Sequence, residues 1–319
     1  MKELKILMIK YRPIGDTIMG LGTIQYIQKL FPGSKITYAV QERVLPLFSN
    51  IVCPDVEFKS ISFLFADWFK TFNFIKKNNF DLIIELQQTG KSKNFFRLFS
   101  KFTLPEYYYH NHNHSGKKFI LDQGIKKPVI QKDLDGVWTA FNYIFPNRKP
   151  EIPYYLDYEP KSEIRNYKLK NNNRVILGVS AGRKEKIWDL KNYEKLISSL
   201  TEINNELKFI IPLSEEEFDT GIEKEISNWE IKNYIIIKKS IGELPYEMSE
   251  SNYYIGNDTG LKHLAVSLGM KTLTIFGEER PMEWHPYNLQ RHSYVFSGDI
   301  KKVSFKEVLD KSIKLIKNL

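Results

Sequence analysis

The sequence is short of cysteine and of long apolar runs, and each shortage excludes a class of protein. Cys53 is the only cysteine among 319 residues, so disulfides and cysteine-rich zinc sites are excluded, and a reducing, cytoplasmic compartment is expected. No stretch reaches the ~18 uncharged apolar residues that a membrane span requires. The apolar run 4–9 is too short for a signal peptide, since Lys10 and Arg12 follow it at once.

Acidic residues are also in deficit. There are 47 lysines and arginines against 38 aspartates and glutamates, which gives a formal net charge of +9. This surplus favours acidic partners such as nucleotides, anionic glycans or a lipid surface. Nucleic acid is not an expected partner, because the sequence contains no helix-turn-helix, zinc-finger or RNA-binding motif.

What the sequence does contain is a repeated alternation of buried strands and helices. In the first half, strands are expected at 4–9, 36–40 and 80–86, and helices at 16–30 and 135–145. In the second half, strands are expected at 175–179, 207–213, 234–237, 253–255 and 272–276, and helices at 189–204, 215–228, 243–250 and 306–317. This order predicts α/β domains with parallel sheets. Four prolines and a polar run within 146–173 indicate a linker, so we expect domains at 1–160 and 161–319.

The stretch 253–277 carries the most informative pattern, a strand, a sharp turn, a short helix and a second strand. Asp258 or Thr259 is expected to supply the N-cap oxygen of the helix. The free N–H groups at a helix start suit a phosphate, and Gly260 would let one approach the backbone. His263 adds a further donor. An ordinary capped βαβ unit explains this stretch equally well.

A second strand end also points to a ligand. In a parallel sheet, ligands lie outside the carboxyl ends of the strands, where Arg12, Gly15 and Asp16 follow the first strand. Simple capping of the helix that begins there is the alternative role of Asp16.

Two segments combine aromatic and basic residues, 65–72 and 91–102. Either one could form a basic amphipathic surface for a membrane or a lipid-linked acceptor. For the first segment we favour a helix that faces the core, and for the second both interpretations stay open. The alternating His110, His112 and His114 are expected in a solvated loop near an acceptor, and no metal site is expected there.

The run Gly178-Val-Ser-Ala-Gly182 matches the G-x-S-x-G nucleophile elbow of serine hydrolases. The elbow needs a helix directly after Ser180, but the next helix is expected only near Asp189. The cations that intervene suit a phosphate-bearing ligand better. The hydrolase therefore remains an alternative function.

Three stretches of the sequence resemble glycosyltransferase family 9, the heptosyltransferases of lipopolysaccharide core assembly. They are ILMIKYRPIGDTIMGLGTIQYIQKLFPGSKI, SAGRKEKIWDLKNYEKLI and GNDTGLKHLAVSLGMKTLTIFG, and they carry a resemblance that covers nearly the whole chain. The resemblance implies the GT-B fold, an α/β architecture of two Rossmann-like domains facing a central cleft. The N-terminal domain would bind the acceptor and the C-terminal domain the nucleotide-sugar. A terminal helix at about 303–317 would pack back on the N-terminal domain.

The resemblance also implies an activity and a set of residues. The expected reaction is inverting, metal-independent and cofactor-free transfer of a sugar, typically heptose from ADP-heptose, to an anionic glycolipid acceptor at the inner face of the membrane. Asp16 matches the catalytic base. The matching donor-binding residues are Ser180, Lys186, Glu217 (with Glu216 as the alternative), Asp258, Thr259, Gly260, Leu261 and His263. The candidate acceptor-binding residues are Arg12, Lys91, Lys93 and Arg97.

The sequence departs from the family pattern at two places. Val179-Ser-Ala-Gly182 stands where the family often has His-x-Gly-Ala, and the usual Pro-Thr after Gly277 is absent. A donor other than a heptose therefore stays open. Besides the hydrolase, a non-catalytic module that binds a nucleotide-sugar or a glycan is the remaining alternative.

Overall fold

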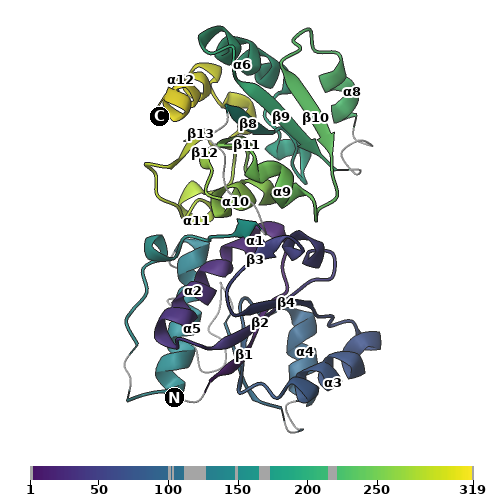
Figure 1. Cartoon of the computed structure of the whole chain (residues 1–319), viewed down its shortest axis with the longest axis vertical. Helices are drawn as coiled ribbons and strands as arrows, with labels where there is room; N and C mark the ends of the chain where they lie inside the picture. Colours follow the sequence, from purple (N-terminus) through teal and green to yellow (C-terminus); the bar gives the residue numbers. More distant parts are fainter. Residues whose placement is uncertain are drawn as a thin grey trace. The chain divides into compact units, whose positions relative to one another are not determined.

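A computed structural model describes residues 3–99, 102, 104–110, 127–147, 150–164, 173–214 and 221–317. Glu216, Glu217, His112 and His114 lie outside the described residues. The chain divides into two α/β units (Figure 1). The first consists of Met1–Phe48 and Val52–Pro160, and the second of Ser49–Ile51 and Lys161–Leu319.

The first unit is built on a parallel sheet with the strand order β4-β2-β1-β5-β6. Its strands are β1 (Lys5–Lys10), β2 (Lys35–Val40), β4 (Val56–Ser60), β5 (Leu82–Glu85) and β6 (Glu106–Tyr109). Its helices are α1 (Ile14–Met19), α2 (Leu21–Leu30), α3 (Trp68–Asn78), α4 (Gly90–Phe99) and α5 (Val129–Ile144). A short pair, β3 (Ile51–Val52) and β7 (Glu163–Ile164), forms a separate sheet, of which Ile51 and β7 belong to the second unit.

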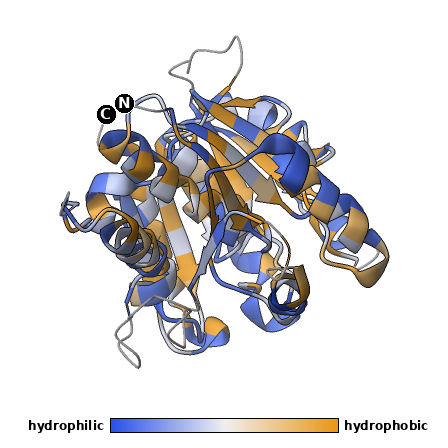
Figure 2. Cartoon of the chain, turned by 90° about the horizontal axis from the view of Figure 1, so that it is seen from below, coloured by the Kyte–Doolittle hydropathy of each residue, from blue (hydrophilic) through white to orange (hydrophobic). Residues whose placement is uncertain are grey.

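Both faces of this sheet are covered, which is why the central strands β1 and β5 are apolar except at their ends. Leu7, Ile9 and Ile83 face the core cluster that includes Phe95 and Phe99 of α4. In the same unit, helices α2 and α5 do not belong to this cluster and pack against each other. Figure 2 shows the hydrophobic colouring along the strands and the mixed colouring of the helices around them. This pattern is typical of a parallel sheet with helices on both faces.

The helix expected at 16–30 begins at Ile14 and is interrupted at Gly20, which ends α1 and precedes α2. Gly20 lies against the ring of Tyr38, whose hydroxyl donates to the carbonyl of Thr17 at 2.9 Å. A Cβ at Gly20 would collide with that hydroxyl. The absence of a side chain at Gly20 therefore lets the helical segment pass close to Tyr38 of β2.

One expectation about the first unit is confirmed only in part, and one is wrong. In the segment 65–72, Trp68 and Phe72 pack against the core cluster as expected, whereas Phe65 is 82% exposed and Phe69 is 76% exposed. His110 is not in a solvated loop, because it follows β6 directly and is fully buried.

The second unit has a six-stranded parallel sheet with the order β10-β9-β8-β11-β12-β13. Its strands are β8 (Arg174–Gly178), β9 (Lys208–Leu213), β10 (Tyr234–Lys238), β11 (Tyr253–Asn257), β12 (Lys271–Phe276) and β13 (His292–Phe296). Its helices are α6 (Leu190–Ile203), α8 (Ile222–Ser227), α9 (Leu244–Ser249), α10 (Gly260–Ser267), α11 (Pro281–Trp284) and α12 (Phe305–Lys317).

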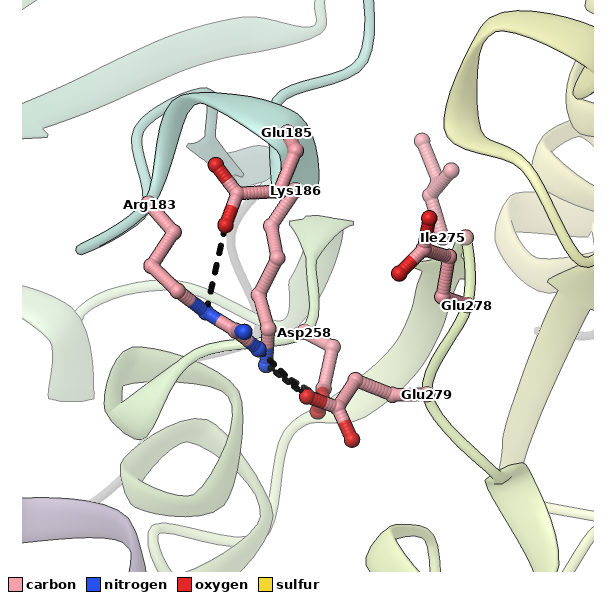
Figure 3. Close-up of a pocket in the computed structure, with 8 residues that line it drawn as sticks. Arg183, Glu185, Lys186, Asp258, Ile275, Glu278 and Glu279 are labelled. Carbon is pink, nitrogen blue, oxygen red and sulfur yellow. Dashed lines mark hydrogen bonds and ion pairs between the residues drawn. The ribbon is translucent and has the colours of Figure 1, made fainter.

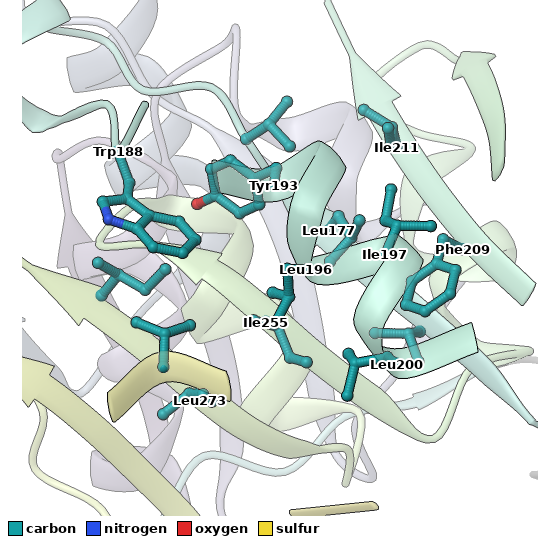
Figure 4. Packing of buried hydrophobic residues seen from close by; sticks show 14 of the residues in the cluster. Leu177, Trp188, Tyr193, Leu196, Ile197, Leu200, Phe209, Ile211, Ile255 and Leu273 are labelled. Carbon is teal, nitrogen blue, oxygen red and sulfur yellow. The ribbon is translucent and has the colours of Figure 1, made fainter. Parts of the chain in front are cut away.

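The core of this unit lies between α6 and the sheet (Figure 4). Tyr193 and Leu196 of α6 pack against strand residues such as Leu177 and Ile255. The terminal helix α12 contributes Val308 to the same core and packs against α6 and β12. The helix therefore contributes to the core of the second unit, and the expectation that it also packs back on the N-terminal domain stays a prediction. Within the described residues, we find no helix of the length and apolar character that a bilayer crossing demands.

Candidate functional site

The carboxyl ends of β8 and β11 approach each other unusually closely. Gly178 and Gly256 are register partners in these strands. A Cβ on Gly256 would lie 2.6 Å from backbone atoms of Gly178, so a larger residue would force the strands apart. The two loops that follow, 179–188 and 258–259, therefore start from neighbouring points at one edge of the sheet.

Asn257, the last residue of β11, connects these two loops. It is fully buried. Its amide nitrogen donates to the carbonyl of Val179 at 2.9 Å. Its side-chain oxygen accepts from the backbone N–H of Trp188 at 3.1 Å and from the hydroxyl of Tyr193 at 3.0 Å. Asn257 therefore holds both ends of the 179–188 loop, and the sequence motif alone gave no indication of this role.

Trp188 anchors the same loop from the other side. Its ring is 1% exposed and lies against the rings of Tyr193 and Phe305, with centroid distances of 5.0 and 6.3 Å. The two-residue spacing between Lys186 and Trp188 thus has a structural reason, because burial of Trp188 fixes the position of Lys186.

The loops enclose a small polar pocket of about 180 Å³ (Figure 3). Lys186 Nζ lies 2.9 Å from Oε1 of Glu279 and 3.7 Å from Oδ2 of Asp258. Arg183 Nη2 donates to the same Glu279 oxygen at 2.5 Å. Burial would raise the pKa of Glu279, but the bonds from Lys186 and Arg183 outweigh it and lower that pKa. The carboxylate of Glu279 is thus paired with both cations of this pocket, Lys186 and Arg183.

A second lysine, Lys262, forms an ion pair with Asp258. Lys262 is fully buried, and its ammonium group donates to Asp258 Oδ1 and, at 2.8 Å, to the carbonyl of Trp284. Burial lowers the pKa of Lys262, and Asp258 opposes this shift. Asp258 therefore lies between Lys186 and Lys262 and sets the distance between the two positive charges.

The start of α10 is left without a side-chain cap. Thr259 occupies the N-cap position, but neither its side chain nor that of Asp258 makes a capping hydrogen bond in the described chain. The expectation that one of them supplies the N-cap oxygen is therefore wrong. Gly260 and Leu261 form the first turn and are half-buried. A helix start with uncapped N–H groups beside a lysine is suited to an anion.

His263 follows in the same helix but is 4% exposed. Its Nδ1 is bonded to the hydroxyl of Tyr287. Burial, together with the charge of Lys262, holds the pKa of His263 well below 6.5. The imidazole is therefore neutral at neutral pH, and it can offer a hydrogen bond but no positive charge.

The loop after β8 is not a nucleophile elbow. Ser180 is followed by a 3₁₀ turn, Lys184–Lys186, and α6 begins only at Leu190. An elbow requires the helix to start directly after the serine. The serine hydrolase alternative is therefore rejected. Ser180 itself is half-buried at the end of β8, in the same loop as Lys186.

In the first unit, Asp16 lies in the first turn of α1, two residues after the helix begins. It does not cap that helix, because no side-chain cap bond is present at the Pro13 N-cap. Its Oδ1 is buried and has no hydrogen-bond partner among the residues that the structure describes. Burial raises the pKa of Asp16, Lys10 and Arg12 oppose the shift, and Asp133 adds to it.

A buried ionic cluster lies near Asp16. Lys10 Nζ contacts Asp133 Oδ2 at 2.7 Å, and His110 Nε2 lies 3.2 Å from Asp133 Oδ1, with all three side chains fully buried. Lys10 ends β1, His110 follows β6, and Asp133 belongs to α5. Because these residues are up to 123 positions apart, no local sequence motif could reveal the cluster.

The candidate acceptor residues are only partly brought together. Lys93 and Arg97 line one pocket of about 360 Å³, together with Gln88, Tyr107 and Tyr109. The exposed Lys91 and the half-buried Arg12 do not line this pocket. Behind it, Tyr107 donates to Glu85, and burial raises the pKa of Glu85 to about 7.

Comparison with known proteins identifies the family. The family model for glycosyltransferase family 9 (heptosyltransferase) matches residues 68–309, which is more than half of the chain. Lipopolysaccharide heptosyltransferase 1 of Campylobacter coli is 24% identical over 97% of this chain and 93% of its own length. The lipopolysaccharide core heptosyltransferase OpsX of Haemophilus influenzae is 20% identical over 88% of this chain and 81% of its own length.

Solved structures agree on the fold. E. coli heptosyltransferase WaaC with ADP has a TM-score of 0.75 at 15% identity, covering 98% of this chain and 100% of that one. The glycosyl transferase family 9 structure from Veillonella parvula has a TM-score of 0.76 at 12% identity, covering 98% and 97%. The fold is therefore GT-B, with two Rossmann-like units, as the sequence predicted. The chain belongs to glycosyltransferase family 9, the heptosyltransferases.

Proposed function

We propose that this glycosyltransferase moves heptose from ADP-heptose to a lipopolysaccharide core acceptor, with inversion and without a divalent metal. The observation that carries the proposal is the half-buried Asp16, whose Oδ1 is buried without a hydrogen-bond partner in the described chain and whose pKa is raised by burial. Relatives in the family are lipopolysaccharide heptosyltransferases, and one solved structure contains ADP.

In this proposal, Asp16 is the general base. It takes the proton of the acceptor hydroxyl as the hydroxyl oxygen forms a bond to the anomeric carbon. The bond between the anomeric carbon and the phosphate oxygen breaks, and its electron pair leaves on ADP. A base whose pKa is raised toward neutrality is better matched to this transfer than an ordinary carboxylate.

The second unit binds the donor. Lys186 and the uncapped start of α10, at Thr259, Gly260 and Leu261, supply donors for the diphosphate and offset the charge that it gains in the transition state. Asp258 positions Lys186, and neutral His263 is a further donor. Ser180 contacts the diphosphate and Glu217 the ribose in the role that the family resemblance gives them.

The first unit binds the acceptor. Lys93 and Arg97 line a pocket with tyrosine rings, which suits an anionic sugar, because cations pair with its carboxylate or phosphate while rings stack on its apolar face. Arg12 and Lys91 are assigned to the same acceptor with less structural support. The acceptor is a glycolipid, so we place the protein at the inner face of the membrane.

The test is a transfer assay with the purified protein, ADP-heptose and heptose-deficient lipopolysaccharide. We expect a product that is heavier by one heptose in mass spectrometry, and release of ADP, both in the presence of a metal chelator. Binding of ADP-heptose without any turnover would instead support the non-catalytic module. Transfer from another nucleotide-sugar only would correct the donor.

A further inference from the structure

An exposed apolar surface covers α3 and α4 of the first unit, and we refer to it as the aromatic face. Its side chains are large, apolar and mostly exposed to solvent: Leu64 (50%), Phe65 (82%), Phe69 (76%), Leu98 (47%) and Phe102 (57%). So many exposed apolar groups in one place are unusual on a soluble protein surface and indicate an interaction site.

The aromatic face is continuous rather than a set of scattered residues. Phe65 contacts Trp68, with a centroid distance of 5.0 Å, and Trp68 contacts Phe99 at 6.1 Å. Phe99 in turn contacts Phe69 at 6.3 Å and Phe102 at 6.1 Å. Half-buried and buried rings thus support the exposed ones from below. In Figure 1, α3 and α4 lie together at one edge of the first unit.

The charge of the two helices is entirely positive. The sequences WFKTFNFIKKN and GKSKNFFRLF contain three cations each and no acidic residue. All six cations are exposed: Lys70, Lys76, Lys77, Lys91, Lys93 and Arg97. The carboxylate that precedes α3, Asp67, accepts a hydrogen bond from Ser62 at 2.6 Å.

From these observations we infer that the aromatic face docks on the surface of an anionic phospholipid bilayer. Phenylalanine and leucine side chains insert between the lipid acyl chains, while lysines along the same helices contact phosphate headgroups. A second copy of the chain fits less well, because a twofold interface would place six cations against six.

The inference deepens the proposed function and rests on it in one respect, since an acceptor glycolipid is held in a bilayer. Helix α4 contributes to both sites. Leu98 belongs to the aromatic face, whereas Lys93 and Arg97 line the tyrosine-containing pocket. Docking through this helix would bring the pocket to the headgroup region, where the sugars of a glycolipid begin.

The test is co-sedimentation of the whole protein with vesicles of phosphatidylglycerol and phosphatidylcholine in equal amounts, against vesicles of phosphatidylcholine alone. The variant is F65S/F69S. Its matched control is I152S/I235S, which replaces two other exposed apolar residues that are 72% and 56% exposed. We expect binding to the anionic vesicles only, a loss of about tenfold in F65S/F69S, and wild-type binding in the control.

A second variant, K70Q/K76Q/K77Q, leaves every aromatic ring in place and guards against misfolding of the first. Each lysine removed is expected to weaken binding to the anionic vesicles by roughly fivefold, and less at high salt. Wild-type binding by both variants, or no binding by the wild-type protein, would overturn the inference. A dimer that F65S/F69S converts to a monomer, with unchanged lipid binding, would assign the face to a second copy instead.

The two proposals can fail separately. With a water-soluble acceptor glycan that carries no acyl chains, F65S/F69S should transfer sugar at the wild-type rate. If neither protein transfers sugar, the proposed function is wrong, while the vesicle result still decides the role of the aromatic face.

Discussion

At the scale of single residues, the isolated carboxylate of Asp16 makes the sharpest prediction. Asp16→Asn should lower the transfer rate about 10²–10⁴-fold, because the amide cannot accept the hydroxyl proton. Nucleotide binding, measured by calorimetry, should not change. Asp157→Asn, at an exposed position, is the control and should keep full activity. Retention of full turnover by Asp16→Asn would remove Asp16 from the role of base.

The raised pKa of Asp16 also fixes the sign of two pH effects. The base must be ionised, so transfer should decline as the pH falls through a pKa that lies above the ordinary 3.8. For stability the sign is the opposite: a carboxyl group with a raised folded-state pKa stabilises the fold at low pH, and this contribution is lost as the pH rises through that pKa. At neutral pH, Asp16→Asn should therefore melt at the same temperature as the wild-type protein or higher.

In the pocket that contains Lys186 and Glu279, which we propose binds the donor, two substitutions should have opposite effects on the nucleotide affinity. Lys186→Ala removes a charged donor and should raise the Kd of ADP about ten- to a hundredfold. Glu279→Gln frees Lys186 and Arg183 from a partly exposed ion pair and should lower that Kd about two- to fivefold. Calorimetric titration measures both values. A weaker affinity in Glu279→Gln would mean that Glu279 contacts the nucleotide itself.

At the scale of elements, the hydrogen bonds of Asn257 connect β11 to the loop that carries Lys186. Asn257→Leu would remove three buried hydrogen bonds, and of the three partners only Tyr193 keeps another bond within the described part of the chain, to the carbonyl of Gly178 at 3.3 Å. We therefore expect the free energy of unfolding to fall by about 3 kcal/mol. The nucleotide affinity should fall as well, because Lys186 loses its fixed position. Asn228→Leu, at the exposed end of α8, serves as the control in the same denaturant titration. Equal stability of the two variants would contradict this role.

The elements that the sequence predicted are those with a continuous apolar run. The buried strands β1, β5, β8 and β12 belong to this group, because both faces of a central strand are covered. Strands β4, β6 and β13 were missed. β4 and β13 lie at sheet edges, and β4 (VEFKS) is polar and largely exposed, so its sequence carries no such run. β6 (EYYY) is also an edge strand and is only four residues long.

In the candidate site, residues that lie in short sequence motifs could be predicted, whereas contacts between residues far apart in the sequence could not. Lys186, Asp258 and Gly260 could be selected because each lies in a short motif beside a predicted strand end. The contacts of Asn257 with Val179 and Trp188, and of Lys10 with Asp133, join residues 69 to 123 positions apart. Such pairs depend on tertiary packing, which hydropathy and spacing do not encode.

At the scale of the whole molecule, binding of a nucleotide should be visible as a change in stability. A ligand that binds only the folded state adds about 2.7 kcal/mol at a hundred times its Kd. We expect ADP to raise the melting temperature more than UDP, GDP or CMP, in a thermal-shift experiment with equal concentrations. The response should be smaller in Lys186→Ala, and a larger shift with another nucleotide would change the proposed donor.

The ion pairs of Glu279 have a consequence for the catalytic cycle. The carboxylate of Glu279 is already bound to Lys186 and Arg183. In the proposed donor site it would compete with every diphosphate, whether that diphosphate enters on the sugar donor or remains as the spent product. Departure of the product is rate-limiting in many enzymes. We therefore expect Glu279, by pairing again with its two cations, to shorten the residence time of the spent nucleotide, which would exchange some ground-state affinity for faster clearance of the pocket.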